Sequence, residues 1–310
     1  MYIIYSGCQW KYLFSFAFAM IDILTSRYWE DYKLLDSGNK LKLEQFGKYI
    51  LIRPEPQALW RPEKSLEQWR KIANAEYKAT GNYSGKWIKY KHTPNRWIMK
   101  YRSPEVKLRF YVELRQFKNV GVFPEQAVNW DYIMTRARQI ENCKVLNLFA
   151  YTGLASITAR VAKAEVTHVD ALKSSMNVAR ENMLLNNVGH IRWIHDDVRK
   201  FVKREIRRKN KYNGVILDPP AFGHGPKKEK WVLEDHLAEL IEDISKIMYR
   251  KNFFLVVNTY SLNMSALTLG NIISDSFGNF TVKKMEIGET FLPEEYGRKL
   301  STGVVVRVYG

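Results

Sequence analysis

Cysteine is scarce in this chain of 310 residues, which contains only Cys8 and Cys143. Two cysteines build neither a disulfide framework nor a cysteine-based zinc site, so the sequence is typical of a reducing compartment, and we expect the cytoplasm. None of the six histidines shows metal-ligand spacing: His92, His168, His190, His195, His224 and His236. We therefore predict no metal site.

Long hydrophobic runs are also missing. An apolar run at residues 12–21 is too short to cross a bilayer, and Asp22 closes it. It resembles the core of a signal peptide but lacks a good cleavage site, and the alternative is that Met20 is the true start. We predict that residues 1–27 form an N-terminal extension, and whether residues 1–19 belong to the native protein stays open. No membrane partner is expected.

Acidic residues are few relative to basic ones. The chain has 32 Asp and Glu against 49 Lys and Arg, which gives a net charge of +17. Such a surplus favours a polyanionic partner, and the alternative is a lineage bias toward lysine. With 46% hydrophobic and 26% charged residues, the composition excludes disorder, collagen-like repeats and a multi-span membrane protein. At roughly 150 residues per domain, the length predicts about two domains.

Residues 28–118 show short strand patterns separated by turn residues, which predicts a small β-rich α+β domain. A strand is expected at residues 49–53, where Pro54 ends it. Apolar residues at helical spacing after Pro62 predict a helix within residues 63–79. Three alternating segments predict antiparallel strands with one solvated face: 86–90, 96–101 and 106–114.

Residues 84–118 combine positive charge with aromatic rings. They hold ten Lys and Arg against two acids, with seven aromatic residues interleaved. Cations neutralise phosphates and aromatic faces stack on bases, so this mixture favours contact with single-stranded or loop RNA, and Trp87 and Trp97 are predicted to contact it. The alternative is a half-buried sheet with a solvated basic face.

From residue 142 strand and helix patterns alternate, which is typical of a parallel sheet with crossover helices. Strands are expected at 145–149, 166–169, 191–194, 214–217 and 253–258, and helices at 154–163, 174–186, 199–209 and 233–248. Two final strands near 281–287 and 303–309 follow each other without a long helix, which predicts a reversed last pair. The fold class expected for residues 119–310 is a Rossmann-like, seven-stranded α/β domain.

Polar residues follow the strands of this predicted sheet where ligands of open parallel sheets bind. The turn Tyr151-Thr152-Gly153 lets the backbone approach a ligand, but no GxGxxG motif is present, so a dinucleotide is disfavoured. Asp170 after the second strand could accept both hydroxyl protons of a ribose. Asp196 and Asp197 after the third could accept from an adenine amine. The loop that begins at Asp218 is made rigid by Pro219 and Pro220.

These segments resemble class I S-adenosylmethionine-dependent methyltransferases, and within them the bacterial large-subunit (23S) ribosomal RNA methyltransferases. The resemblance is carried by residues 121–126, 147–153, Asp170, Asp196-Asp197 and 218–223. Residues 36–38 and 53–60 resemble the N-terminal part of the same group, so the likeness runs from about Tyr28 to the C-terminus.

The resemblance implies a set of site residues. Those expected to bind S-adenosylmethionine are Phe123, Gln126, Asn147, Phe149, Tyr151, Thr152, Gly153, Asp170, Asp196, Asp197 and Asp218. Those expected to act on the target base are Asp218, Pro219, Pro220 and Phe222. Substrate contacts are expected from Tyr260, His224, Lys227, Lys228, Trp87 and Trp97.

Two departures from the family pattern concern the chemistry. Members that methylate carbon 5 of cytosine use a cysteine near the loop after the fifth strand, and residues 258–263 contain none. Cys143 is expected to be a small buried hydrophobe. In the loop after the fourth strand the aromatic Phe222 comes one place late, after Ala221. These departures favour direct transfer to a nitrogen, or to an oxygen as the alternative, without a covalent adduct.

Phe222 or Tyr260 could stack on a flipped base, although Phe222 could equally pack the loop and Tyr260 could cap the sheet. Asp218 and the loop carbonyls would accept hydrogen bonds from a base amine. His224 is placed in a mobile loop, and the basic run 199–211 is either a solvated helix face or part of an RNA footprint.

The sequence thus predicts a cytoplasmic enzyme, an S-adenosylmethionine-dependent methyltransferase that acts on RNA, with ribosomal RNA expected. The alternatives are a protein or small-molecule methyltransferase and a non-catalytic RNA-binding protein with this fold. The target nucleotide, the methylated atom and the oligomeric state stay open.

Overall fold

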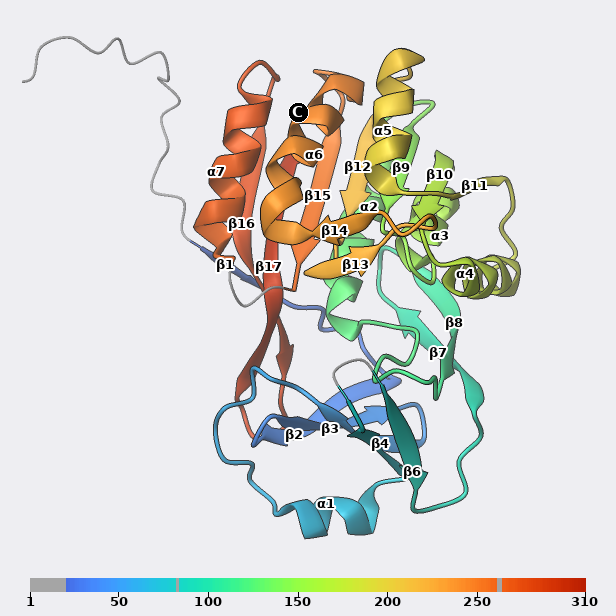
Figure 1. The fold of residues 1–310 in the computed structure, drawn as a ribbon, viewed down its shortest axis with the longest axis vertical. Helices are drawn as coiled ribbons and strands as arrows, with labels where there is room; N and C mark the ends of the chain where they lie inside the picture. The colour runs from blue at the N-terminus through green and yellow to red at the C-terminus, as the bar shows by residue number, and fades with distance from the viewer. Residues whose placement is uncertain (1–20, 82–83, 261–263) are drawn as a thin grey trace, which may run out of the picture.

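The computed structural model describes residues 21–81, 84–260 and 264–310, and the predictions for residues 1–19 lie outside them. A large α/β part occupies the upper half of Figure 1, and a small lobe built on a β-sheet lies below it. The central sheet of the α/β part has eight strands in the order β1-β16-β17-β15-β12-β9-β10-β11.

Five neighbouring strands of this sheet are parallel, as predicted: β9 (Lys144–Leu148), β10 (Glu165–Asp170), β11 (Ile191–His195), β12 (Gly214–Leu217) and β15 (Phe254–Thr259). The last strand, β17 (Lys299–Tyr309), inserts antiparallel between β15 and β16 (Lys284–Pro293), which confirms the reversed last pair. An eighth strand, β1 (Asp22–Leu24), pairs in parallel with β16. Residues 22–24 are therefore part of the sheet, whereas the sequence assigned them to an extension.

The crossover helices lie where their apolar periodicity placed them: α3 (Leu154–Val161), α4 (Lys173–Leu185), α5 (Val198–Arg207) and α6 (Leu233–Ile247). Two helices were not predicted, α2 (Ala127–Arg138) and α7 (Ala266–Phe277). No helix within the described ranges is long and apolar enough to span a bilayer.

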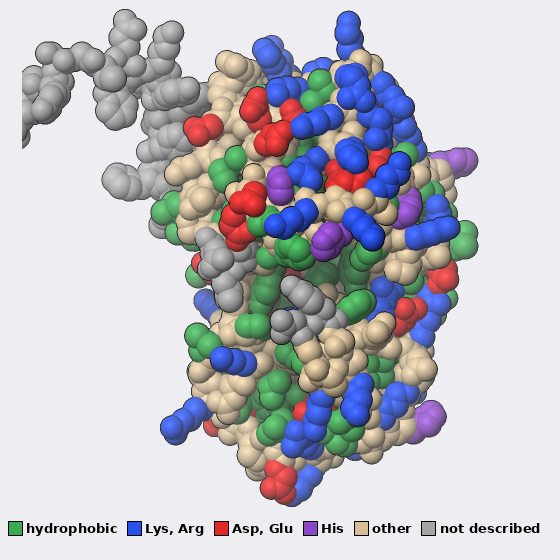
Figure 2. Space-filling model, viewed as in Figure 1, with side chains coloured by type: hydrophobic (Ala, Val, Ile, Leu, Met, Phe, Trp, Pro, Cys, Tyr) green, Lys and Arg blue, Asp and Glu red, His purple; other side chains and the backbone are tan. Residues whose placement is uncertain are grey.

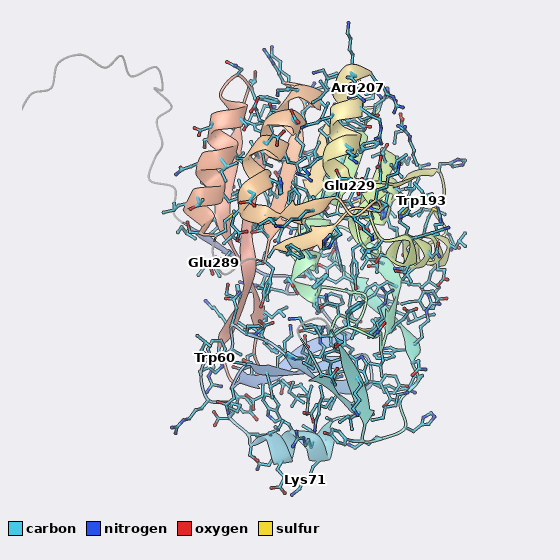
Figure 3. The ribbon with its side chains drawn as sticks, in the orientation of Figure 1. Trp60, Lys71, Trp193, Arg207, Glu229 and Glu289 are labelled. Atoms are coloured by element: carbon cyan, nitrogen blue, oxygen red, sulfur yellow. The ribbon has the colours of Figure 1, made fainter. Side chains whose placement is uncertain are left out.

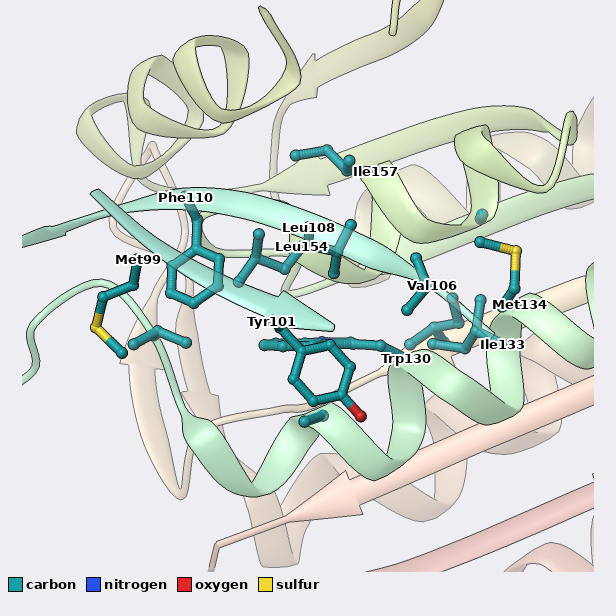
Figure 4. Packing of buried hydrophobic residues seen from close by; sticks show 14 of the residues in the cluster. Met99, Tyr101, Val106, Leu108, Phe110, Trp130, Ile133, Met134, Leu154 and Ile157 are labelled. Carbon is teal, nitrogen blue, oxygen red and sulfur yellow. The ribbon is translucent and has the colours of Figure 1, made fainter. Parts of the chain in front are cut away.

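Two hydrophobic cores cover the two faces of the sheet. Adjacent residues of β9 belong to different cores, Val145 to one and Leu146 to the other, because side chains of a strand alternate between faces. The first core contains Trp130 of α2 and Ile157 of α3 (Figure 4), and the second contains Phe201 of α5. Burial on both faces explains why the parallel strands read as continuous apolar runs.

The small lobe is a five-stranded sheet in the order β2-β3-β4-β5-β6 with one short helix. Its strands are β2 (Tyr32–Gly38), β3 (Leu41–Phe46), β4 (Tyr49–Pro54), β5 (Ala75–Ala79) and β6 (Gly85–Lys89). The helix predicted within 63–79 is wrong in its second half, because only α1 (Leu66–Ile72) is helical. Ala73 turns to an extended conformation, and β5 then pairs with β4 and β6.

A separate hairpin follows the small lobe. Its strands, β7 (Arg96–Arg102) and β8 (Lys107–Glu113), pair only with each other among the described residues. Their buried face, with Met99, Tyr101 and Phe110, packs in the core that also holds Trp130 and Leu154 (Figure 4). The β-rich region predicted for residues 28–118 thus comprises two sheets, and the hairpin packs on the α/β part.

The two halves of the molecule are tied together at several points. The β16–β17 hairpin extends below the central sheet toward the small lobe (Figure 1), where Leu34 forms an isolated bridge with Glu294. The Ser37 hydroxyl donates to the Glu294 carboxylate at 3.1 Å. The short 3-10 helix η1 (Pro124–Gln126) lies in the connection that leads into α2.

Candidate active site

The residues that follow the parallel strands gather at one edge of the central sheet. Since β9, β10, β11, β12 and β15 are parallel, their carboxyl ends face the same way, which is toward the small lobe in Figure 1. Figure 2 shows a hollow between the two halves of the molecule at this level, with hydrophobic side chains on its walls. Ligands of open α/β sheets bind at such an edge.

The turn after β9 is built from three residues with left-handed backbone. Phe149, Tyr151 and Gly153 have φ values of 53°, 49° and 83°. Such a conformation is uncommon for non-glycine residues and clusters at functional sites. A Cβ added at Gly153 would lie 2.8 Å from the Cβ of Ala179 in α4, so only glycine fits there. The Thr152 hydroxyl holds the turn by donating to the carbonyl of Gly121 at 2.7 Å.

Asp170 at the end of β10 is buried and held by backbone amides. Its Oδ2 accepts from the N–H of Tyr151 and its Oδ1 from the N–H of Leu172, both at 2.7 Å. Burial raises the pKa of the Asp170 carboxyl, and the two amide bonds oppose that rise. Each carboxylate oxygen has two lone pairs, so Asp170 can accept two further hydrogen bonds, as a ribose diol would supply.

The acidic pair after β11 has structural partners. One Asp197 oxygen caps α5 by accepting from the N–H of Lys200 at 3.0 Å. Asp196 forms an ion pair with Arg204 and accepts from the N–H of Asp197. The backbone of this pair adjoins the end of β10, since the carbonyl of Asp170 accepts from the N–H of Asp196 at 3.2 Å.

Asp218 after β12 ends a chain of oriented side chains. Arg307 donates to the Asn129 amide oxygen at 2.6 Å, and the Asn129 amide donates to Gln126 at 2.7 Å. The Gln126 amide then donates to Asp218 at 2.9 Å, and Asn258 reaches the other carboxylate oxygen at 3.4 Å. This chain fixes which end of the Gln126 amide faces Asp218. Burial, with the nearby negative charge of Glu125 as the next cause, raises the pKa of Asp218 to about 7.

Glu125 is a site residue that the sequence did not single out. Its side chain is buried, and its Oε2 has no hydrogen-bond partner among the described residues. Burial raises its pKa to about 7, against the lowering effect of Lys42 in the small lobe. Glu125 therefore couples Asp218 electrostatically to the small lobe. Its position next to Gln126 in the sequence was the available signal.

We expect Glu125→Gln to change how stability depends on pH. A folded-state pKa raised above the unfolded value means that the native state binds the proton more tightly. The free energy of unfolding of the wild type should therefore fall as pH rises from about 5 to about 8, by an amount on the order of 2–3 kcal/mol from this residue. Glu125→Gln should lack that contribution, which urea unfolding at pH 5.5 and 8.5 would measure.

The exposed Glu141 supplies a control for this prediction, since Glu141→Gln should leave the pH dependence unchanged. Parallel pH profiles for the wild type and Glu125→Gln would contradict the prediction.

The loop after β12 is more ordered than the sequence indicated. Residues 222–224 and 230–232 form a hairpin, β13 (Phe222–His224) and β14 (Lys230–Val232), so His224 does not lie in a free loop. The Trp231 indole donates to the carbonyl of Pro220 at 2.7 Å, and the carbonyl of Ala221 accepts from the backbone of Leu233. Each of these two carbonyls accepts one hydrogen bond within the protein and retains a second lone pair, so their predicted contact with a base amine stays a prediction.

Two aromatic residues that were expected at the substrate have different surroundings. Phe222 is 44% exposed and meets the ring of His224 edge-on, with centroids 5.2 Å apart. The Tyr260 hydroxyl donates to Glu55 of the small lobe, so Tyr260 joins the two halves. Glu55 in turn pairs with Lys42 at 3.1 Å. Burial and the charge of Glu55 raise the pKa of Tyr260.

Other predicted site residues lie away from this edge or serve packing. Asn147 donates to Ser156 of α3 at 2.9 Å within the core. The half-buried indoles of Trp87 and Trp97 donate to backbone carbonyls. Lys227 and Lys228 are exposed at the tip of the β13–β14 hairpin, near Glu229 (Figure 3). Both rings remain partly exposed, so the predicted contact of Trp87 and Trp97 with RNA stays a prediction.

Comparison with known proteins identifies the fold and its cofactor. A model of the S-adenosylmethionine-dependent methyltransferase family matches residues 51–262. The chain belongs to this family. A solved structure of an S-adenosylmethionine-dependent methyltransferase from Agrobacterium tumefaciens is 38% identical, with 92% of each chain covered and a TM-score of 0.84.

Two curated relatives of this methyltransferase carry more specific names. The ribosomal RNA large subunit methyltransferase K/L of Pseudoalteromonas atlantica is 32% identical over 43% of this chain and 18% of its own length. The ribosomal RNA large subunit methyltransferase I of Escherichia coli is 28% identical over 37% of this chain and 29% of its own length. The matched stretch thus spans less than a third of either relative.

The strand-end residues of this methyltransferase fit S-adenosylmethionine chemically. Asp170 retains acceptor capacity for a ribose diol, and the space beside Gly153 admits no side chain. The rings of Phe123 and Tyr151, with centroids 5.4 Å apart, add an apolar wall next to that turn. No group of three or more His, Cys, Asp or Glu in the described part of the chain could hold a metal ion.

Proposed function

We propose that this methyltransferase modifies RNA, with large-subunit ribosomal RNA as its substrate, by direct transfer to a base nitrogen without a cysteine adduct. The observation that carries the proposal is Asp218, a half-buried carboxylate that follows β12 and is held by Gln126 and Asn258. The names of the two curated relatives and the net charge of +17 support RNA as the substrate.

The cofactor would be held by the strand ends. In this proposal Asp170 accepts from the ribose hydroxyls, and the turn at Phe149, Tyr151 and Gly153 lines the methionine and ribose portions. Asp197, with Asp196 as its neighbour, contacts the adenine. When bound, S-adenosylmethionine supplies a methyl group already activated by its sulfonium, so the protein contributes mainly position and orientation.

Asp218 would act on the acceptor. Its carboxylate accepts a hydrogen bond from the base amine, which orients the amine and raises electron density on its nitrogen, and it then takes the proton that this nitrogen loses on methylation. Gln126 and Asn258 hold the carboxylate in place. Phe222 offers its exposed ring to a base turned out of its stack.

A cysteine nucleophile is disfavoured on physical grounds. Cys143 is buried directly before β9, at the opposite edge of the sheet from Asp218. Burial raises the pKa of its thiol to about 12, so it stays protonated at neutral pH. Cys8 lies outside the described residues.

The small lobe and the β7–β8 hairpin would form the RNA-binding region of residues 28–118, ahead of the methyltransferase domain of residues 119–310. Basic side chains also gather over α5 in Figure 2. Two of them are neutralised, since Lys200 pairs with Glu229 and Lys203 pairs with Glu239. The α5 face therefore contributes less free positive charge than its sequence indicates.

The test uses radiolabelled S-adenosylmethionine with an extract of cells that lack this protein, fractionated into ribosomal RNA, transfer RNA, DNA, protein and small molecules. We expect label in ribosomal RNA, and nucleoside digestion should place it on a base nitrogen. Label confined to protein or metabolites would contradict the substrate. No label in any fraction, together with absent cofactor binding, would favour a non-catalytic RNA-binding protein.

A further inference from the structure

A pocket of about 530 Å³ lies between the β7–β8 hairpin and the C-terminal end of α4. It is lined by Lys100, Tyr101, Arg102, Lys107, Leu108, Arg109, Leu185, Asn186 and Asn187. Four of the nine lining residues are cations and none is acidic. This pocket belongs to neither the strand-end site nor the contacts that join the two halves.

The four cations are placed directly opposite one another across the hairpin. Lys100 faces Arg109 and Arg102 faces Lys107 in the antiparallel register. All four side chains are exposed, and none forms an ion pair within residues 21–81, 84–260 and 264–310. Like charges in directly opposed positions destabilise a strand pair, so this arrangement has a cost that an anionic ligand would remove.

Another cation on the same face of the hairpin, Arg96, is paired with acidic residues. Arg96, four residues before Lys100, pairs with Glu113 at 2.8 Å and with Glu181 of α4. Its guanidinium also lies 3.6 Å from the ring centroid of Tyr111. Counter-charges are therefore supplied at one end of the hairpin and withheld at the end that lines the pocket.

The walls of the pocket are held in fixed positions. The Asn186 amide bonds both backbone groups of Arg109, accepting from its N–H at 2.8 Å and donating to its carbonyl at 2.6 Å. Asn182 accepts from the N–H of Tyr111 at 3.0 Å. Tyr101 and Leu108 anchor the strands in the core from the opposite face. Cations on a rigid hairpin form a preorganised anion site at lower entropic cost.

We propose that this pocket binds the phosphodiester backbone of RNA, at a site separate from the methyl-transfer residues. The inference rests on the proposed function for the identity of the polyanion. Exposed Lys and Arg with the exposed Asn187 amide match phosphate oxygens, whereas a protein partner would need a larger apolar centre. Strand β8 ends at Glu113, and the chain then leads to Gly121, whose carbonyl accepts from the Thr152 hydroxyl. At about 3.3 Å per residue, the six steps from Lys107 to Glu113 separate the pocket end of β8 from its other end by roughly 20 Å.

The experiment compares two variants that lose the same charge. The pocket variant carries Lys100→Gln, Arg102→Gln, Lys107→Gln and Arg109→Gln. The control variant carries Arg138→Gln, Arg250→Gln, Lys251→Gln and Lys283→Gln, which replace exposed cations elsewhere. Binding of fluorescein-labelled large-subunit ribosomal RNA fragments is measured from 50 to 200 mM salt. Affinity for S-adenosylhomocysteine reports whether each variant keeps its cofactor site.

The salt dependence gives the expected size of the effect. Each phosphate contact contributes about 0.7–0.9 to the slope of log affinity against log salt, so four contacts contribute about 3. Between 50 and 200 mM salt the wild type should lose roughly 50- to 150-fold more affinity than the pocket variant. The control variant should keep the wild-type slope, and cofactor affinity should be unchanged in both. If the fourfold variant does not fold, two double variants replace it. One carries Lys100→Gln with Arg109→Gln, and the other carries Arg102→Gln with Lys107→Gln. Each should lower the slope by about half as much as the fourfold variant would.

Equal slopes for the wild type and the pocket variant, or an equal fall in the control variant, would overturn the proposal. Competition by poly-glutamate as strong as by RNA would overturn RNA as the ligand in favour of an acidic protein. A wild type that binds RNA through this pocket but labels no RNA in the transfer experiment would refute the proposed function and leave the pocket standing.

Discussion

In Asp218→Ala the rate of methyl transfer should fall about 10³-fold, while the affinity for S-adenosylmethionine changes only a few fold. Removing a positioned proton acceptor or oriented hydrogen-bond partner of a reacting group typically lowers rates by about 10²–10⁴-fold. Asp218 is such a group in the proposed mechanism, since Gln126 and Asn258 orient it. Single-turnover transfer to ribosomal RNA gives the rate, and calorimetry with S-adenosylhomocysteine gives the affinity.

The pH profile separates this role from a structural one. With a pKa of about 7, Asp218 becomes a carboxylate over the neutral range, so wild-type transfer should rise from pH 6 to pH 8 and then level off. The Asp218→Asn side chain keeps the shape of aspartate but has no carboxylate. Its rate of methyl transfer should therefore be low and independent of pH. Asp275→Ala, at an exposed position on α7, is the matched control and should behave as the wild type. Equal losses of transfer and cofactor affinity in Asp218→Ala would contradict the acceptor role.

Much of the α/β part could be predicted from the sequence because its periodicities are local and strong. Strands such as β12 and β15 are buried along their whole length, so each reads as one apolar run. Parallel strands then bring their carboxyl ends to one edge, which is why the sequence alone predicts that Asp170 and Asp218 lie near each other. Their predicted roles stay predictions.

The parts that could not be predicted depend on contacts between distant residues. The helical spacing of residues 66–79 continues past Ile72, but pairing with β4 and β6 turns residues 75–79 into a strand. The chain gives no local signal that Tyr260 will bond Glu55, 205 residues away. Nor does it signal that the indole of Trp97 will donate to the carbonyl of Phe46, 51 residues away. Long-range pairing overrides local pattern at each of these positions.

Asp170→Asn should weaken binding of S-adenosylmethionine by about a hundredfold, and it should do so through the ribose. A hydrogen bond to a charged group contributes roughly 1.5–3 kcal/mol, and tenfold in affinity corresponds to about 1.4 kcal/mol. The amide also replaces an acceptor with a donor against the N–H groups of Tyr151 and Leu172, so part of the loss is a local rearrangement.

An analogue of S-adenosylhomocysteine that lacks both ribose hydroxyls separates these two effects. The wild type should bind it about a hundredfold more weakly than S-adenosylhomocysteine, whereas Asp170→Asn should bind the two ligands almost equally, because it has already lost the carboxylate that tells them apart. A rearrangement of the turn alone would weaken both ligands by the same factor and leave the discrimination intact. If the wild type and Asp170→Asn showed the same ratio of affinities for the two ligands, Asp170 would not bind the ribose hydroxyls. Loss of Asp218, in contrast, should leave the ratio of affinities for the two ligands unchanged. The same measurement therefore assigns Asp170 to the cofactor and Asp218 to the acceptor independently.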